Sequence, residues 1–200
     1  RDSKSAYVSD LITPHIYSIE NSAVPPISTD YISRKRVNSV LGQAEIGYNN
    51  YAFLTLTGRN DWSSTLPENS RSYFYPSVSG SFIFSDAFNI QNNWLDYGKL
   101  RASWARVGND TDPYQLRGAF VASDVFNGFP TFAEPNQLPN SNLKSETTES
   151  WEFGAELGFL GGRLGLDATY YNRKTFDLIM PVSISRASGY TSQIVNAGTT

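Results

Sequence analysis

From residue 37 onward, apolar and polar side chains alternate with a period of two, and this pattern limits the possible folds more than any other feature of the sequence. In the clearest case, residues 76–85, apolar side chains and glycine alternate with serine, with Ile83 as the exception. Successive side chains of a β-strand point to opposite faces, so the pattern predicts strands with one apolar and one polar face. We predict six strands, at residues 37–48, 51–60, 72–85, 98–107, 148–159 and 163–180. The first 33 residues, interrupted by prolines, are predicted to be loop.

The polar faces of these strands indicate contact with water. Between the apolar positions of residues 76–85 stand Ser77, Ser79, Ser81 and Ser85. Hydroxyl groups without partners are costly in a dry core but tolerable beside a water-filled channel. The pattern favours a transmembrane β-barrel wall. A soluble β-sandwich shares the same period and remains an alternative.

The predicted connections alternate in length. Short turns at Asn49-Asn50 and Gly161-Gly162 alternate with long connections at 61–72, 108–145 and from Pro181 onward. Outer-membrane barrels have short periplasmic turns and long extracellular loops. Aromatic residues also gather near strand ends, as in the girdles at membrane boundaries: Tyr48, Tyr51, Phe82, Phe84, Phe159 and Tyr170. Both regularities favour the barrel.

Composition narrows the possible functions. The chain has no cysteine, which excludes disulfides and thiolate metal sites. Its net charge of -3 and pI of about 5.2 give no electrostatic case for nucleic-acid binding. No stretch approaches the ~18 apolar residues that a membrane helix needs. Because the chain begins with Arg1, we expect it to be a segment of a longer protein.

Five blocks, in order, resemble the SusC/RagA transporters of Bacteroidetes. In the first, 58–64 (GRNDWSS) precedes 75–82 (YPSVSGSF), and Trp62 stands where the family commonly has Gly. The second pairs 99–104 (KLRASW) with 107–109 (VGN). The others are 138–146 (LPNSNLKSE), 158–164 (GFLGGRL) and 170–179 (YYNRKTFDLI). The resemblance covers roughly residues 37–198 and departs from the family pattern at Ser141 and Ser145.

The resemblance implies an all-β fold, a segment of a large antiparallel transmembrane barrel of about 22 strands. Residues 1–200 would form part of one barrel domain, with the plug, the TonB-contacting segment and the N-terminal extension upstream. Members import oligosaccharides or peptides across the outer membrane, powered through TonB. A SusD-like surface lipoprotein usually covers the barrel as a lid.

No catalytic or metal site is predicted, and no cofactor. The one histidine, His15, is interpreted as an ordinary loop residue. Residues 109–112 (NDTD) could touch calcium but lack the glycine and the distal Glu of a calcium loop, so a solvated loop end is favoured. Glu152 and Glu156 would lie ~13 Å apart on one strand face, too far for a glycosidase pair, and we expect them to line a wet wall beside Arg and Lys.

Five aromatic residues of the presumed extracellular loops are the candidate contacts for substrate or lid: Trp62, Tyr114, Phe126, Phe129 and Phe132. Exposed aromatic faces can stack on sugar rings or pack on a partner, although packing of loop on loop is an equal alternative. The predicted function is non-enzymatic, TonB-dependent import of a glycan or peptide by a multi-pass barrel in the outer-membrane bilayer. The alternatives are a surface receptor or adhesin barrel and a soluble β-sandwich carbohydrate-binding module.

Overall fold

The computed structural model describes residues 2–90 and 94–200 and divides into two compact units, Arg1–Lys35 and Arg36–Thr200. In the first unit, β1 (Asp2–Tyr7) pairs antiparallel with β2 (Ile27–Ile32), and the short 3-10 helix η1 (Ile19–Asn21) lies between them. The prediction that the first 33 residues are loop was therefore wrong for these strands. Their pairing joins segments that are distant in sequence and carry no clear alternation. One barrel domain over residues 1–200 stays a prediction.

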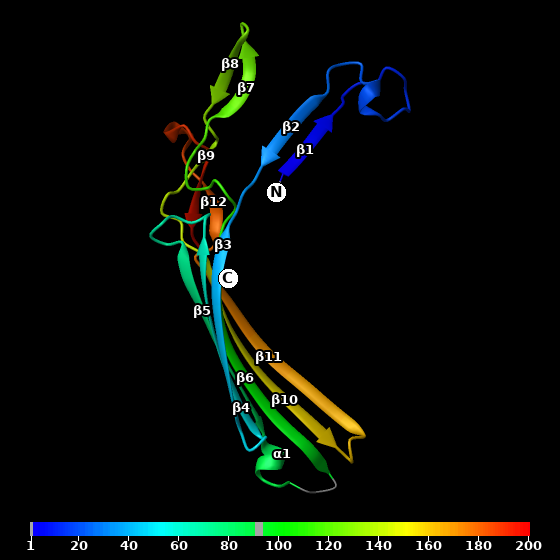
Figure 1. Ribbon diagram of the computed structural model, residues 1–200, viewed down its shortest axis with the longest axis vertical. Helices are drawn as coiled ribbons and strands as arrows, with labels where there is room; N and C mark the ends of the chain where they lie inside the picture. Colours follow the sequence, from blue (N-terminus) through cyan, green and yellow to red (C-terminus); the bar gives the residue numbers. More distant parts are fainter. Residues whose placement is uncertain (1, 91–93) are drawn as a thin grey trace. The chain divides into compact units, whose positions relative to one another are not determined.

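The second unit is built on a six-stranded antiparallel sheet in the order β11-β10-β6-β5-β4-β3 (Figure 1). Neighbours in this sheet also follow one another along the chain, apart from the insertion between β6 and β10. The strands are β3 (Val37–Tyr48), β4 (Ala52–Ser63), β5 (Ser72–Ile83), β6 (Leu95–Asn109), β10 (Glu146–Phe159) and β11 (Leu164–Phe176).

The strand register sorts side chains onto two faces, which we call the apolar face and the polar face. Rows such as Ile46–Leu54–Gly80 and Ala44–Leu56–Val78 lie on the apolar face. The row of Glu45, Thr55, Ser79, Ser103 and Glu152 lies on the polar face. The period-two pattern of the sequence therefore continues across all six strands.

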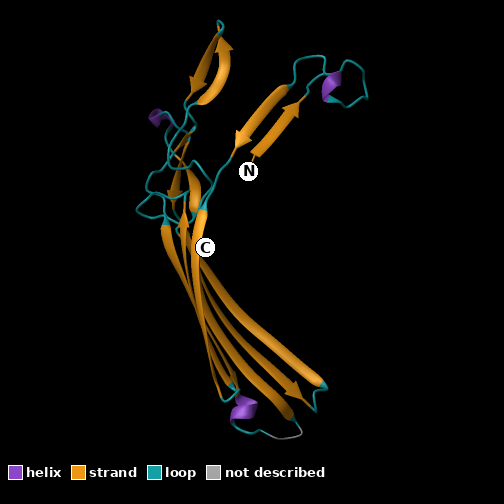
Figure 2. Ribbon diagram, in the orientation of Figure 1, coloured by secondary structure: helices purple, strands orange, loops and turns teal. Residues whose placement is uncertain are grey.

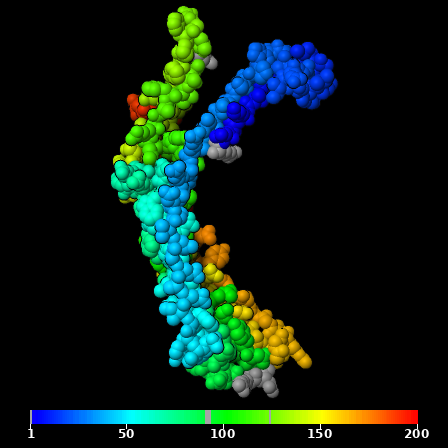
Figure 3. Space-filling model, in the orientation of Figure 1, coloured from blue at the N-terminus to red at the C-terminus, as the bar shows by residue number. Residues whose placement is uncertain are grey.

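Neither face of this sheet is covered within the described residues. Side chains of the apolar face such as Ile46 and Leu166 are more than half exposed, at 58% and 52%. The buried hydrophobic residues among the described ones are Leu66, Leu143 and Ile194, and none of them belongs to the six strands. Figure 2 shows the strands of this sheet as a single layer, and Figure 3 shows the same view in space-filling form, with β3 and β4 in blue to cyan. The two stacked sheets that a β-sandwich needs are not found in the described residues, and a soluble domain of this length would bury far more apolar surface.

One end of the sheet carries the short turns, and we call it the short-turn end. Asn49 and Asn50 adopt positive φ of 46° and 60° between β3 and β4, as a tight hairpin turn with the right-handed twist requires. Gly161 and Gly162 are likewise at positive φ between β10 and β11. Aromatic rings cluster here through edge contacts of Tyr51 with Tyr48 and Phe82.

The β5–β6 connection lies at the same end and is longer than the hairpin turns. The predicted strand at 72–85 was wrong in its last two residues, because α1 (Phe84–Ala87) begins at Phe84. The Phe84 ring lies over Gly98, where a Cβ atom would be only 2.1 Å from the ring. Part of this connection, residues 91–93, lies outside the described residues. No helix among the described residues is long and apolar enough to cross a membrane.

The opposite end, the long-loop end, contains more regular structure than predicted. The stretch 108–145 was predicted as loop, yet it holds β7 (Val121–Phe126), β8 (Phe129–Ala133) and β9 (Gln137–Leu138). The predicted strand at 163–180 was wrong beyond Phe176, because Asp177 adopts a φ of 55° and breaks the ladder. Its remainder belongs to β12 (Ile179–Ser183), and Pro181 lies inside this strand rather than at its end. A proline is tolerated there because β12 is an edge strand.

A small three-stranded sheet, β12-β13-β9, completes the long-loop end. Strand β13 (Ser192–Asn196) follows the 3-10 helix η2 (Arg186–Ser188), in a segment that was predicted to be loop. Strand β9 pairs with β13 in parallel although more than fifty residues separate them. Long-range pairing of such short strands leaves no periodic signal in the sequence.

Candidate functional site

Charged side chains on the polar face pair across neighbouring strands and also along one strand. Lys99 on β6 faces Glu156 on β10, with 3.9 Å between Nζ and Oε2. Arg59 on β4 binds Asp61 through Nε–Oδ1 at 2.7 Å, and Asp61 also accepts a hydrogen bond from the Tyr75 hydroxyl at 3.2 Å. This arrangement agrees with the expectation that the carboxylates line a wall beside Lys and Arg. The wall presents both signs of charge and several hydroxyl groups.

Arg101 on β6 reaches across β10 to bond with β11, and Gly154 makes this reach possible. The register places Ser81, Arg101, Gly154 and Thr169 in one row over four strands. Because Gly154 has no side chain, Arg101 lies across β10 and donates to Asp167 Oδ1 at 2.7 Å and Thr169 Oγ1 at 2.6 Å on β11. A Cβ atom at Gly154 would lie 2.3 Å from Arg101 Nε.

Two shallow depressions lie along the polar face. The first, about 240 Å³, is lined by hydroxyl groups, Lys99, Arg101 and Glu152. The second, about 420 Å³, lies nearer the long-loop end and is lined by Arg59, Asp61 and Tyr75 among others. Closely spaced donors and acceptors in such a wall suit ligands rich in hydroxyl or amide groups.

A small buried cluster holds the long loops to the sheet; we call it the loop base and define it as Leu66, Leu143 and Ile194. Leu143 is fully buried at 0% exposure. The side chain of Asn196 fixes the surrounding backbone, because its Nδ2 donates to the carbonyls of Lys144 and Asp177, both at 2.9 Å. Three segments distant in sequence therefore meet at this cluster.

Asp110 performs a related structural role beside the loop base. Its carboxylate accepts hydrogen bonds from the Ser63 hydroxyl and from Thr65 Oγ1, the latter at 3.2 Å. Ser63 and Thr65 are both buried. Asp110 therefore links the start of the β6–β10 loop to the β4–β5 loop. Among the described residues, no group of three or more potential metal ligands occurs.

Tyr114 lines a larger cleft between the loops. The cleft, about 600 Å³, is mostly apolar and is formed by the segments 64–68 and 116–119 together with Tyr114 and Ser141. Leu116 contributes an apolar wall and Arg117 a positive charge. Tyr114 is 60% exposed and its backbone has a φ of 71°. A cleft with an aromatic ring and a guanidinium group could accept a sugar ring or a peptide side chain.

Three of the predicted aromatic residues share one hairpin. Phe126 and Phe129 pair across the two-residue turn Asn127-Gly128, whose positive φ values of 50° and 82° suit a tight hairpin. Phe132 lies on the same β7–β8 hairpin, and the three residues are 65–73% exposed. A two-stranded hairpin with so much exposed apolar surface is typical of a segment that packs on a partner.

The structure does not bring all five predicted aromatic residues together. Trp62 was placed in a loop, but β4 continues to Ser63 and pairs Trp62 with Asn38 and Ser72 on the apolar face. The ladder runs three residues beyond the predicted strand end because β3 and β5 continue to pair with β4 on its two sides. A role for these five residues in binding stays a prediction. His15 lies exposed in the first unit with a φ of 67°.

Sequence reasoning missed the polar residues that join the segments around the loop base. Asp110 was considered only as a possible calcium ligand, and Asn196 and Glu146 were not considered as structural residues. Glu146 accepts hydrogen bonds from the Ile179 amide at 2.8 Å and from Asn109 Nδ2 at 3.1 Å. Near the same loops, the Tyr190 hydroxyl donates to Glu134 Oε1 at 2.7 Å, and this hydrogen bond raises the pKa of Tyr190. Such contacts join distant segments and leave no local pattern in the sequence.

Comparison with known proteins decides the family. Residues 5–200 match the model of the family described as TonB dependent receptor-like, beta-barrel. The chain belongs to this family of TonB-dependent receptor barrels. The chain is 34% identical over 180 residues to TonB-dependent receptor P26 of Formosa agariphila, covering 86% of this chain and 18% of the relative. It is 30% identical over 177 residues to TonB-dependent receptor SusC of Bacteroides thetaiotaomicron, covering 83% of this chain and 17% of SusC.

The fold also matches a solved structure. The structure of the RagAB peptide transporter superposes with a TM-score of 0.84 at 22% identity, covering 99% of this chain and 22% of that chain. The chain spans less than a quarter of the length of each of these relatives. The predicted resemblance to SusC/RagA transporters and the predicted all-β barrel segment are confirmed. The family is one of receptors and transporters rather than enzymes. In a barrel of this family the apolar face contacts lipid and the polar face lines the interior.

Proposed function

We propose that this chain forms wall strands and extracellular loops of an importer that carries a glycan or peptide nutrient across the outer membrane, driven through TonB. The observation that carries the proposal is that the six-stranded sheet has one apolar face and one polar face, and that both faces are uncovered. Family membership supports it, because the matched relatives are TonB-dependent receptors. The short-turn end would face the periplasm and the long-loop end the cell exterior.

Substrate would meet this segment at two places. The loop cleft beside Tyr114 offers an aromatic ring and the Arg117 guanidinium at the long-loop end. The polar face then continues with the two depressions that contain Arg59, Lys99 and Arg101. A wall of mixed charges and hydroxyl groups lets a polar solute exchange hydrogen bonds step by step without tight retention.

The aromatic β7–β8 hairpin would contact a SusD-like lipoprotein that covers the barrel. The paired residues Phe126 and Phe129 are exposed beside the turn of this narrow element, and Phe132 is exposed further along β8, as expected for a partner contact. The RagAB structure supports this inference, because RagA-type barrels resemble this chain over nearly its whole length.

Transport by the full-length protein tests the proposal. Cells that express the gene are compared with a deletion strain for uptake of labelled oligosaccharides and labelled peptides, with and without a protonophore. We expect uptake of one substrate class that requires both the gene and the proton gradient. Surface binding of the substrate without entry would instead establish a receptor or adhesin barrel.

A second comparison tests the hairpin. The double variant Phe126→Ser/Phe129→Ser is expected to lower copurification of the lipoprotein about tenfold, because two buried aromatic contacts are lost. The matched control is Tyr170→Ser, an exposed aromatic residue on the apolar face of β11. If the hairpin variant copurifies the lipoprotein fully and shows normal uptake, the proposed contact between hairpin and lid is contradicted, whereas the transport proposal is unaffected.

A further inference from the structure

Phe53 is an apolar residue on the polar face of the sheet. It pairs with Gly47 on β3 and with Ser81 on β5. The other positions of β4 on this face carry polar side chains: Thr55, Thr57, Arg59, Asp61 and Ser63. A phenyl ring in channel water is unfavourable unless something covers it. The position of Phe53 therefore indicates a surface that takes part in binding.

The ring of Phe53 lines a depression that combines three kinds of group. A Cβ atom at Gly47 would lie 3.4 Å from two atoms of the ring, so the ring lies beside the backbone of β3. The ring also lines the depression of about 240 Å³, together with Ser81 and Arg101. Arg101 is held by Asp167 at 2.7 Å. An aromatic ring, hydroxyl groups and a fixed guanidinium group thus surround one space.

The second depression of the polar face, about 420 Å³, repeats this combination around Tyr75. A Cβ atom at Gly108 would lie 2.6 Å from the Tyr75 ring, so this ring also lies beside a glycine. Arg59 lines the depression and is held by Asp61 at 2.7 Å. The two N–H groups of Arg59 Nη1 make no hydrogen bond with the described residues, so they can donate to a ligand.

A strip of hydroxyl groups joins the two depressions. Phe53 pairs with Ser81, and Tyr75 lies six residues from Ser81 on β5, about 20 Å along the strand at ~3.3 Å per residue. Between the two rings lie four polar-face residues, which we call the hydroxyl strip: Thr55, Thr57, Ser77 and Ser79. Each of these hydroxyl groups can donate and accept a hydrogen bond. An extended ligand could therefore contact both rings and the strip together.

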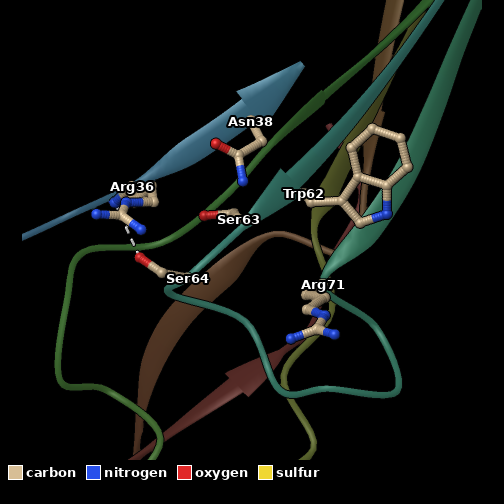
Figure 4. Close-up of a pocket in the computed structure, with 6 residues that line it drawn as sticks. All are labelled: Arg36, Asn38, Trp62, Ser63, Ser64 and Arg71. Atoms are coloured by element: carbon tan, nitrogen blue, oxygen red, sulfur yellow. Dashed lines mark hydrogen bonds between the residues drawn. The ribbon is translucent and has the colours of Figure 1, made fainter. Parts of the chain in front are cut away.

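A third depression, at the ends of β3 and β4, does not extend the strip. Figure 4 shows the indole of Trp62 and the guanidinium groups of Arg36 and Arg71 around this space of about 370 Å³. Trp62 pairs with Asn38 on the apolar face, and no carboxylate is among the described residues that line the depression. The two depressions of the polar face therefore form a surface of their own.

The groups on this surface favour a carbohydrate. A sugar ring has an apolar C–H face, which packs on an aromatic ring, and a rim of hydroxyl groups, which bind hydroxyl, guanidinium and carboxylate groups. A peptide that binds by strand addition needs an exposed strand edge. The strip lies on the face of β4, which is paired along both sides, and offers no such edge.

We propose that Phe53 and Tyr75 are two stacking positions for an extended oligosaccharide that lies along the hydroxyl strip, with Arg101 and Arg59 donating to its hydroxyl groups. The inference rests on the proposed function, because the strip lies in a transport channel only if the polar face lines the interior of a barrel. It narrows the nutrient from a glycan or peptide to a glycan.

The test measures ligand binding by the full-length receptor in detergent. The receptor is screened against a broad array of neutral and acidic oligosaccharides and against a mixture of hexapeptides, and the tightest ligand is titrated by calorimetry. We expect an oligosaccharide to bind. Phe53→Leu and Tyr75→Leu are each expected to weaken its binding about tenfold, because each variant loses an aromatic contact. A disaccharide of the same glycan should bind more weakly, since it cannot reach both rings.

Control variants separate the rings from general effects. Leu54→Ala, one residue along β4 and on the apolar face, should leave the affinity unchanged. Phe53→Tyr and Tyr75→Phe keep an aromatic ring and should retain most of the affinity. These two variants also show whether the fold tolerates substitution at each position.

Four results would overturn the inference. Binding of hexapeptides but of no oligosaccharide would assign the other nutrient class. An equal loss in Leu54→Ala would show general damage, and equal affinity for the disaccharide would show that the two rings do not act on one ligand. Unchanged affinity in both leucine variants, with normal uptake, would remove the strip as a binding site and leave the import proposal standing. The import proposal itself fails only if no labelled substrate enters the cells in a gene-dependent way.

Discussion

The six-stranded sheet and the loop base are stabilised in opposite ways. The sheet is held by backbone ladders, and its large side chains remain exposed on both faces. The loop base contains the three buried hydrophobic residues of the described chain, together with side-chain hydrogen bonds between distant segments. The sheet therefore depends on what surrounds it, namely lipid on one side and channel water on the other. The loop base depends on its own packing, as a small soluble domain does.

This difference explains where substitutions should be tolerated. In the sheet, the effect of a substitution on stability should depend more on the face that the residue occupies than on the volume of its side chain. In the loop base, volume matters more, because Leu143 has no exposed surface to relax into. Four substitutions test this contrast in the full-length protein.

One of the two largest effects is expected for Leu56→Arg, in the middle of the apolar face. An arginine near the bilayer midplane destabilises an outer-membrane barrel by about 2–4 kcal/mol. The matched control is Thr57→Arg, one residue along β4 and on the polar face, which should change stability by less than ~1 kcal/mol. Reversible unfolding in lipid vesicles measures both variants. Equal destabilisation would contradict the assignment of the two faces.

A comparable effect is expected for Leu143→Ala in the loop base. Truncation of a fully buried leucine leaves a cavity and costs about 2–5 kcal/mol. The loss should be local, so hydrogen exchange is expected to speed up at residues 64–71 and 192–196 while the strands of the sheet remain protected. Leu164→Ala, an exposed position on the apolar face, serves as the control. Uniformly faster exchange over β3–β6 would show that the two regions are not separate.

A smaller effect is expected for Gly154→Ala. The new Cβ atom would lie 2.3 Å from Arg101 Nε and push the guanidinium away from Asp167 and Thr169, at a cost of about 1–3 kcal/mol. Gly165→Ala is the matched control, because its Cβ atom would meet nothing within 4 Å. The same unfolding assay compares the two variants. A larger loss in the control would show that strand propensity, rather than the Arg101 contact, decides the result.

The smallest effect is expected for Tyr190→Phe, which removes the hydroxyl that donates to Glu134. The hydrogen bond raises the pKa of Tyr190 in the folded state. Its contribution to stability is therefore fully present below the ordinary tyrosine pKa of about 10 and is lost as pH rises through the raised value. The stability difference between wild type and variant should be constant from neutral pH to about pH 9 and vanish at higher pH. A difference that grows with pH would contradict this sign.

The sequence by itself determined the sheet and its two faces, because a period of two is a local property that each strand repeats independently. Asn49-Asn50 and Gly161-Gly162 marked the short turns for the same local reason: these residues tolerate positive φ. The five sequence blocks that resemble SusC/RagA transporters added the assignment to a transmembrane barrel. Only the tertiary structure decided the loop base, the reach of Arg101 over Gly154 and the position of Trp62 on the apolar face. Each of these depends on segments that meet through register and long-range packing, and such contacts leave no periodic trace along the chain.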